Sequence, residues 1–385
     1  MFEIVDSNQA SGTVIKVIGV GGAGGNAVDH MIRNGVTGVE FFAANTDAQS
    51  LSRCMAKQQI QLGATGLGAG AKPEAGRAAA LEQRDAIREM LQGAHMCFIT
   101  AGMGGGTGTG AAPVVAETAR EMGILTVAVV TKPFAFEGKR IRIAEAGIAE
   151  LSQHVDSVIV ILNEKLIEVL GDDVSMKEAF RAADDVLYNA VAGISEIINS
   201  PGLVNVDFED VRTVMAEMGM AMMGSAYSGG IDRARVAAEQ AVASPLLEGV
   251  NLSGARGVVV NITASDGLKM REVHEVMRTI QSFAAEDAHI IFGAVYDESM
   301  ADNLRVTVVA TGLGNREVAR HTKPQLVVQR TGTDNAGVGI GVTDYGALDA
   351  GPAVFRKNRH STIEALTASG VDKYDIPAFL RKQAD

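Results

Sequence analysis

The feature that most constrains this chain is a run of glycines, GGGTGTG at residues 104–110, between two apolar segments. The segment before it, MCFITAG, reads as a buried strand, and the segment after it, AAPVVAETA, reads as a helix. Glycine loses more conformational entropy on folding than any other residue, so such a cluster must meet a demand that other residues cannot. That demand is a positive φ angle, or an approach so close that a Cβ atom would collide with a ligand.

A second glycine loop, GVGGAGGN at residues 19–26, also lies between an apolar strand and a helical pattern. Its Gly19, Gly21 and Gly24 match the spacing of dinucleotide-binding loops, a signal that is weak when it stands alone. Both loops follow strands of an expected parallel sheet, and such sheets bind ligands at the carboxyl ends of their strands. We therefore expect both loops at one ligand-binding edge.

Two glycine loops at one edge favour a nucleotide with several phosphates. Backbone amides can hold phosphate oxygens, and Thr107 and Thr109 add hydroxyl donors. Close packing of helix on sheet accounts for one glycine per loop but not for both clusters. A P-loop is excluded because no GxxxxGK[ST] sequence occurs. A nicotinamide dehydrogenase, with Glu40 or Asp47 as the acid after the next strand, is the alternative on the first loop alone.

Apolar strands and helices alternate through the first half of the chain. Strands are expected at 13–19, 39–46, 96–102, 124–131 and 155–163, and helices at 26–35, 74–93, 111–123 and about 174–198. Short, continuous apolar strands separated by helices are typical of a parallel sheet covered on both faces. The fold class is therefore α/β, with a Rossmann-like nucleotide-binding domain and a long helix after it.

The pattern changes in the second half. The run MAEMGMAMMG at 215–224 predicts a Met-rich helix ending near Gly224, which we interpret as adaptable core. Strands are expected at 255–265, 287–296 and 303–312, with one helix at 271–285. These elements indicate a second, smaller α/β domain.

Periodicity is lost after Asn315, where Gly, Thr, Asp, Asn and basic residues dominate, as in a disordered linker. At the end of the chain Ile376, Phe379 and Leu380 share one helical face, as in peptides that dock into a partner's groove. The expected divisions are a flexible tail (1–12), a nucleotide-binding domain (13–173), a central helix (174–200), a catalytic loop with connecting helix (201–224), a second domain (225–314), the linker (315–370) and a docking peptide (371–385).

Composition excludes several classes of function. The formal net charge is −12, with the acidic excess before residue 316, which argues against binding nucleic acid through a basic face. The N-terminus has no basic start and no apolar block, so no signal peptide is expected. Two distant cysteines, Cys54 and Cys97, suggest reduced thiols in a cytoplasmic protein. The seven histidines show no ligand spacing, so no zinc site is expected.

GGGTGTG resembles the tubulin signature. Together with GVGGAGGN, FFAANTDAQ, NVDFEDVRTVM and the terminal DIPAFLRK, it makes residues 13–314 and the last peptide resemble the FtsZ family, the bacterial homologues of tubulin. The resemblance implies a GTPase that polymerises head to tail into filaments of the division (Z) ring, in the cytoplasm at mid-cell. It also implies that membrane-tethering adaptors such as FtsA bind residues 371–385.

The resemblance further implies a set of nucleotide contacts. They are Gly22, Ala23, Gly24, Gly25, Asn26, Thr107, Gly108, Thr109, Gly110, Glu137, Arg140, Asn163, Phe180 and Asp184. Ala23 replaces a glycine of many members, which is tolerable if its φ is negative, and Arg142 is an alternative to Arg140. Phe180 would stack on the base. Asp184 would read guanine, since a carboxylate accepts from both N1–H and the 2-amino group. From the residues alone, Asp184 and Asp185 read as a solvated helix face.

The segment NVDFED at 205–210 has two compatible interpretations. In one, Asp207 caps a helix and Asp210 lies in its first turn. In the other, which the resemblance favours, Asn205, Asp207 and Asp210 polarise the water that attacks the γ-phosphate, with Mg²⁺ or a monovalent cation at the subunit interface. If Asp184 reads the base, the following helix carries the chain roughly 20 Å away, at about 1.5 Å per residue. The acids could then reach only the nucleotide of a neighbouring chain in an open filament.

Overall fold

The computed structural model describes residues 12–171, 173–199, 202–204, 206–216, 219–244, 255–285 and 287–313. All of them belong to the first of the two units into which the chain divides, Met1–Ala319 and Arg320–Asp385. The expected flexible tail before residue 12, the linker at 315–370 and the docking peptide at 371–385 lie outside the described residues, as does Asn205.

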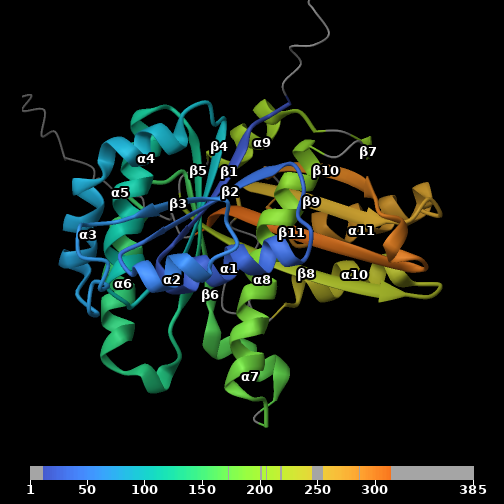
Figure 1. Cartoon of the computed structure of the whole chain (residues 1–385). Helices are drawn as coiled ribbons and strands as arrows, with labels where there is room; N and C mark the ends of the chain where they lie inside the picture. Colours follow the sequence, from blue (N-terminus) through green and yellow to red (C-terminus); the bar gives the residue numbers. More distant parts are fainter. Residues whose placement is uncertain are drawn as a thin grey trace, which may run out of the picture. The chain divides into compact units, whose positions relative to one another are not determined.

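A single sheet runs through the described residues (Figure 1). Its strands are β1 Ile15–Val20, β2 Val39–Asn45, β3 Gln58–Gln61, β4 Met96–Gly102, β5 Leu125–Lys132, β6 Ser157–Leu162, β7 Gly202–Val204, β8 Gly219–Gly229, β9 Gly257–Ala264, β10 His289–Tyr296 and β11 Asn303–Leu313. Their order is β3-β2-β1-β4-β5-β6-β8-β11-β9-β10-β7.

Helices cover both faces of this sheet (Figure 1). They are α1 Gly21–Arg33, α2 Ala48–Arg53, α3 Pro73–Glu82, α4 Arg84–Leu91, α5 Thr107–Glu121, α6 Lys139–Leu151, α7 Asn163–Leu170, α8 Met176–Asn199, α9 Phe208–Met215, α10 Arg233–Val242 and α11 Met270–Gln281, with 3-10 turns η1 Ala135–Glu137 and η4 Glu298–Met300. Within the described ranges, none is both long and apolar enough to cross a membrane.

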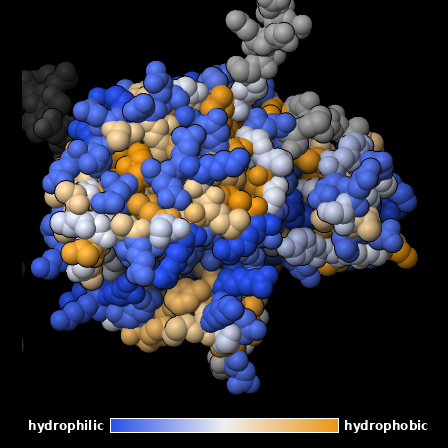
Figure 2. Space-filling view, in the orientation of Figure 1, coloured by the Kyte–Doolittle hydropathy of each residue, from blue (hydrophilic) through white to orange (hydrophobic). Residues whose placement is uncertain are grey.

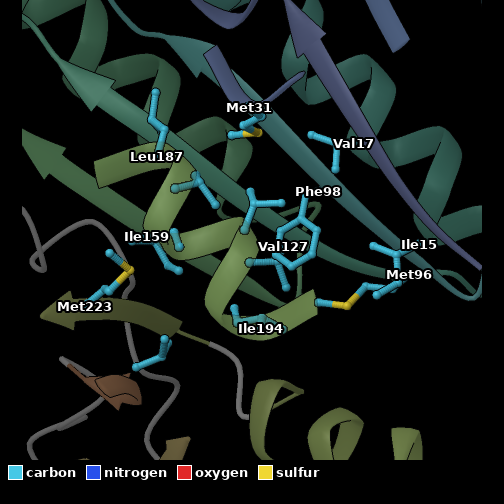
Figure 3. Packing of buried hydrophobic residues seen from close by; sticks show 14 of the residues in the cluster. Ile15, Val17, Met31, Met96, Phe98, Val127, Ile159, Leu187, Ile194 and Met223 are labelled. Atoms are coloured by element: carbon cyan, nitrogen blue, oxygen red, sulfur yellow. The ribbon is translucent and has the colours of Figure 1, made fainter. Parts of the chain in front are cut away.

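The first six strands are all parallel. Their order, β3-β2-β1-β4-β5-β6, reverses between β1 and β4, which makes that position the switch point where such sheets bind ligands. One face packs residues such as Val17, Phe98 and Val127 against α1 and α8 (Figure 3). The opposite face packs Ile18 and Ile99 against α5 and its neighbours. The expected Rossmann-like sheet is confirmed.

The second half of the sheet is mixed. β11 pairs antiparallel with β8 on one side and with β9 on the other, and β9 pairs parallel with β10. Apolar residues of α10 and α11 pack with β8, β9 and β11 in a core cluster of their own. The two halves join through a short parallel pairing of Ser157–Ile159 in β6 with Gly219–Ala221 in β8.

The predicted Met-rich helix ending near Gly224 was wrong. α9 ends at Met215, and Gly219–Gly229 forms strand β8. Met222 and Met223 are buried in different core clusters, on opposite faces of the sheet. A strand buried on both faces reads as an unbroken apolar run, which cannot be told from a helix by its periodicity.

Other boundaries also differ from the predictions. The helix expected at 74–93 is divided at Gln83, whose φ of −106° and ψ of 19° separate α3 from α4. α1 and α5 begin within the glycine loops rather than after them. This earlier start matters, because it turns both loops into first turns of helices.

Candidate nucleotide-binding site

Two helix N-termini meet at the switch point of the sheet. α1 begins directly after β1, and α5 begins four residues after β4. Their N-cap residues, Val20 and Gly106, make no side-chain capping hydrogen bond. The first backbone amides of a helix have no partner within the helix, so both first turns can donate to an anion.

A hollow of about 270 Å³, here called the phosphate hollow, lies at these two helix starts. Predicted contacts that line it are Gly22, Ala23, Thr107, Gly108, Glu137, Arg140, Asn163 and Phe180. Ala23 is not among the residues with positive φ, so its departure from glycine is tolerated as expected. The structure thus brings together residues from β1–α1, β4–α5, β5–α6, β6–α7 and α8.

Most of the loop glycines are required by packing. A Cβ atom at Gly108 would lie 2.6 Å from the Gly102 carbonyl oxygen, and one at Gly24 or Gly110 would collide with a backbone carbonyl. Gly104 has a φ of +96°, a conformation that side chains disfavour. These positions answer the demand for glycine without any ligand.

Three loop glycines are not required by packing. A Cβ atom at Gly22 or Gly25 would meet nothing within 4 Å, and one at Gly105 would meet only the Arg140 guanidinium, at 3.9 Å. Gly22 and Gly105 line the phosphate hollow. Gly25 lines an adjoining hollow of about 220 Å³ with Gly22 and Asn26. Close approach of a ligand is the remaining reason for glycine at these positions.

The two threonines of the signature loop have different roles. Thr107 lines the phosphate hollow, and its Oγ1 lies 2.6 Å from Thr46 Oγ1, a pair that fixes its rotamer. Thr109 is buried, and its Oγ1 accepts a hydrogen bond from Gly104 N at 2.9 Å. Like Gly24 and Gly110, Thr109 lines neither the phosphate hollow nor the adjoining one.

Polar side chains from β5–α6 and β6–α7 complete the phosphate hollow. Arg140 Nη1 donates to Glu137 Oε2 at 2.6 Å, and Glu137 Oε1 accepts from Phe134 N at 3.0 Å. Arg142, the alternative to Arg140, does not line the hollow. Asn163 starts α7 with 4% of its surface exposed, and its Oδ1 has no hydrogen-bond partner among the described residues. A buried acceptor without a partner at this edge fits a ligand that donates to it.

A larger hollow of about 580 Å³, the base hollow, lies between α1 and α8. Three predicted contacts line it: Asn26, Phe180 and Asp184. Phe180 lines both hollows, and its ring meets the Phe134 ring edge-on at 5.5 Å. A planar base in this hollow could therefore contact the Phe180 ring with its face while its edge points toward Asp184.

The environment of Asp184 disfavours its charged form, as expected for a partly buried carboxylate whose hydrogen-bond donors come from a ligand. Burial raises the pKa of the Asp184 carboxyl to about 6; nearby Asp185 raises it too, while His30 and Arg33 oppose the shift. Asp185 itself is exposed and bonds His30 Nε2 through Oδ1 at 2.7 Å. The interpretation as a solvated helix face therefore describes Asp185 but not Asp184, whose charged form would be stabilised by hydrogen-bond donors of a ligand.

The prediction overlooked further residues lining the base hollow. These are Asp29, His30, Arg33, Asn34, Lys177 and Arg181. Their signal is helical spacing, since residues three, four or seven positions apart share a helix face. Asp29, His30 and Arg33 fall at these spacings from Asn26 on α1, whereas Asn34, the C-cap of α1, falls eight positions from it. Lys177 and Arg181 fall three positions before Phe180 and Asp184 on α8. A search along those faces would have found most of them.

The predicted acids lie at the other end of α8. Asp207 is the N-cap of α9, where it accepts from Asp210 N at 2.8 Å, so the capping interpretation is confirmed. Both side chains are exposed. Asp184 stands fifteen residues before Asn199 in an unbroken helix, about 22 Å along its axis. Figure 1 shows α9 near one end of the molecule and α7 at the other.

Comparison with known proteins identifies the family. Residues 14–171 match the Tubulin/FtsZ family, GTPase domain, and residues 219–314 match the FtsZ family, C-terminal domain. The Cell division protein FtsZ of Pseudomonas aeruginosa is 56% identical, and that of Pseudomonas putida 54%, each over 100% of both chains. The chain belongs to the FtsZ family. A solved FtsZ dimer of M. jannaschii is 43% identical, with a TM-score of 0.76 over 80% of this chain and 90% of that one.

As a member of the FtsZ family, the chain is a tubulin-like GTPase that polymerises with its own copies. The matched GTPase domain contains both glycine loops, and it leaves the dehydrogenase alternative without support. GTP and GDP are accordingly its nucleotides.

Proposed function

We propose that each GTP is hydrolysed between two chains of a head-to-tail filament of the division ring, with the acids of one chain completing the site of the next. The observation that carries this is the separation by α8 of the hollows from Asp207 and Asp210. The acids of a chain cannot reach its own phosphates. A contact between unlike ends does not close on itself, so it generates a filament and a complete site together.

On the nucleotide side, the first turns of α1 and α5 hold the phosphates through backbone amides. Gly22 and Gly105 let the phosphates approach the backbone, and Thr107 adds a hydroxyl. Glu137 and Arg140, which line the same hollow, would contact the ribose.

The base end supplies specificity. Phe180 stacks on the purine, and Asn26 and Asp184 contact its edge. Adenine offers no pair of donors to the Asp184 carboxylate, whereas guanine offers N1–H and the 2-amino group. We therefore expect GTP rather than ATP to be the substrate.

On the acid side, Asp207 and Asp210, with Asn205, orient and polarise the attacking water. Among the described residues, no three His, Cys, Asp or Glu side chains are grouped to hold a metal ion. Mg²⁺ is usually bound by one or two carboxylates together with phosphate oxygens. Asp207 and Asp210 fit that donor set at a subunit interface, where Mg²⁺ or a monovalent cation would neutralise phosphate charge.

The cellular setting extends the proposal. We infer that the filaments form in the cytoplasm at mid-cell, because the relatives are named cell division proteins. Membrane-tethering adaptors such as FtsA would bind residues 371–385, whose apolar face suits docking into a groove.

Sedimentation combined with phosphate release, in GTP and separately in ATP, tests this function. We expect pelleted polymer and phosphate release with GTP and neither with ATP. Asp210→Ala should bind GTP and pellet but release little phosphate. Equal activity with ATP would contradict the role of Asp184, and normal hydrolysis by Asp210→Ala would contradict the role of the acids.

A further inference from the structure

The last turn of α9 is held by hydroxyl groups from two strands. Thr311 Oγ1 donates to the Val214 carbonyl at 2.8 Å, and Ser157 Oγ donates to the Met215 carbonyl at 2.7 Å. Both hydroxyl-bearing residues are buried, Thr311 with 0% and Ser157 with 1% of its surface exposed. The last carbonyls of a helix have no partner within it, so these bonds fix the end of α9 in place.

The two hydroxyls come from different halves of the sheet. Ser157 begins β6 in the nucleotide-binding half, and Thr311 lies near the end of β11 in the other half. The pairing of β11 with β8 shifts register between Ala310 and Leu313, and Gly312 has a φ of +73°. Irregularities of this kind re-aim side chains, and here Thr311 is directed at α9.

The backbone of β9 forms the floor of the same contact. Gly257 pairs with Thr311, and a Cβ atom at Gly257 would lie 2.6 Å from Val214 Cγ1. α9 therefore rests on β9 at a distance that only glycine permits. Strands β6, β9 and β11 together define the position of its last turn.

The other end of α9 carries the acids of the proposed reaction. At about 1.5 Å per residue, Asp207 lies about 10 Å and Asp210 about 6 Å along the axis from the anchored Val214. Turning α9 by about 5° around that turn would displace Asp207 by about 1 Å and Asp210 by about half as much. A displacement of that size can lower a reaction rate by about 10²-fold.

We propose that Thr311 and Ser157 are positioning residues for GTP hydrolysis. Their hydroxyls fix the direction of α9, and so place Asp207 and Asp210 on the nucleotide of the next chain. This inference rests on the proposed function, because it requires that those acids act on a neighbouring subunit. Neither Thr311 nor Ser157 lines the phosphate hollow or the base hollow.

The test compares Thr311→Val, which removes only the hydroxyl, with Thr311→Ser, which retains it. Thr307→Val is the matched control, since Thr307 is also buried on β11 but its hydroxyl bonds Ser225 at 2.9 Å instead of α9. Ser157→Ala removes the second hydroxyl independently. GTP affinity, melting temperature, pelleted polymer and phosphate release per polymerised subunit are measured for the full chain, with Asp210→Ala in parallel.

We expect Thr311→Val to bind GTP and pellet normally while releasing phosphate at least fivefold more slowly per polymerised subunit. Ser157→Ala should act in the same direction, and Thr311→Ser should recover to within twofold. Thr307→Val should have a lower melting temperature but an unchanged rate of phosphate release per polymerised subunit. A normal rate in both Thr311→Val and Ser157→Ala, or an equal loss in Thr307→Val, overturns the inference. If Asp210→Ala itself hydrolyses normally, the proposed function fails first.

Discussion

At the residue scale, the loop glycines separate into those facing the ligand and those facing the protein. We predict that Gly105→Ser lowers GTP affinity at least tenfold and leaves the melting temperature within about 2 °C. The added atoms enter the phosphate hollow, where a Cβ atom at residue 105 would have only the Arg140 guanidinium within 4 Å. Calorimetric titration and thermal melting measure the two effects.

Gly110→Ser is the contrasting variant. A Cβ atom there would collide with the Pro73 carbonyl on α3, so the helices must separate and the protein should melt at a lower temperature. Unchanged GTP affinity in Gly105→Ser, or equal melting losses in both variants, would show that the open space at Gly105 has no bearing on nucleotide binding.

Asp184 supplies a pH prediction. Its carboxyl has a pKa raised to about 6 by burial, so the carboxylate is lost as the pH falls through that value. We predict that GTP affinity decreases below about pH 6, approaching tenfold per pH unit, because a protonated carboxyl no longer accepts from both donors of guanine. Titrations between pH 5 and 8 measure it.

The free energy of unfolding should depend on pH in the opposite direction to the GTP affinity. An acid whose pKa is raised by folding disfavours the native state once it ionises, so this contribution lowers the stability of the nucleotide-free protein as the pH rises from about 4 to 6. Asp184→Asn keeps one acceptor oxygen but cannot titrate. This variant should bind GTP more weakly than the parent at pH 8, and its GTP affinity should not change with pH around pH 6. If the affinity still changes there, the titrating group is not Asp184.

At the element scale, the sequence was sufficient wherever apolar runs had clear ends. The strand expected at 96–102 is β4, and the helix expected at about 174–198 is α8. Prediction was wrong at β8, because a methionine-rich run buried on both sides carries no period. Short elements with few buried residues, such as α2 and β3, were not predicted at all.

The residues of the candidate site were also only partly predictable from the sequence. The sequence located both glycine loops, but it could not distinguish Gly22, which opens onto a hollow, from Gly24, which packs on β4. That difference depends on neighbours remote in the sequence. His30 and Arg33 were overlooked because the charges on a helix face usually meet solvent. The packing of α1 beside α8 buries His30 and places Arg33, which stays exposed, at the base hollow.

The close contact of α9 with β9 gives a prediction at this scale. Gly257→Ala places a methyl group against Val214 and Thr311, with approaches of 2.6 Å, so α9 or β9 must shift. We expect a loss of about 1–3 kcal/mol in the free energy of unfolding, as for other overpacked sites. Gly267→Ala is the control, because its nearest neighbour, Ser265 Oγ, would be 3.9 Å away. Denaturant midpoints compare them; equal midpoints would contradict the contact.

At the scale of the whole molecule, the proposed functions of catalysis and docking belong to separate parts of the chain. The match to the FtsZ family, C-terminal domain, ends at residue 314, before the proposed docking peptide at 371–385. We predict that truncation after Gly370 leaves phosphate release within twofold and abolishes binding of the adaptor FtsA in a pull-down or titration. The triple variant Ile376→Ala, Phe379→Ala, Leu380→Ala in the full chain is the matched control. Native affinity in either variant would refute the docking role.

Mixing two defective chains tests whether the site is shared between molecules. Asp210→Ala retains its hollows but lacks an acid, whereas Gly105→Leu retains the acids and fills its phosphate hollow. Each alone should release little phosphate. In a mixed filament, the intact hollow of the first chain meets the intact acids of the second.

The rate of phosphate release should therefore peak at intermediate mixing ratios, where contacts between unlike chains are most frequent. A chain carrying both substitutions is the control, because mixing it with Asp210→Ala creates no contact that unites an intact hollow with intact acids. Sedimentation of labelled Gly105→Leu with Asp210→Ala establishes that both enter one polymer. If they co-sediment and no ratio restores hydrolysis, the acids do not act on the neighbouring nucleotide, and the distance along α8 has no catalytic consequence.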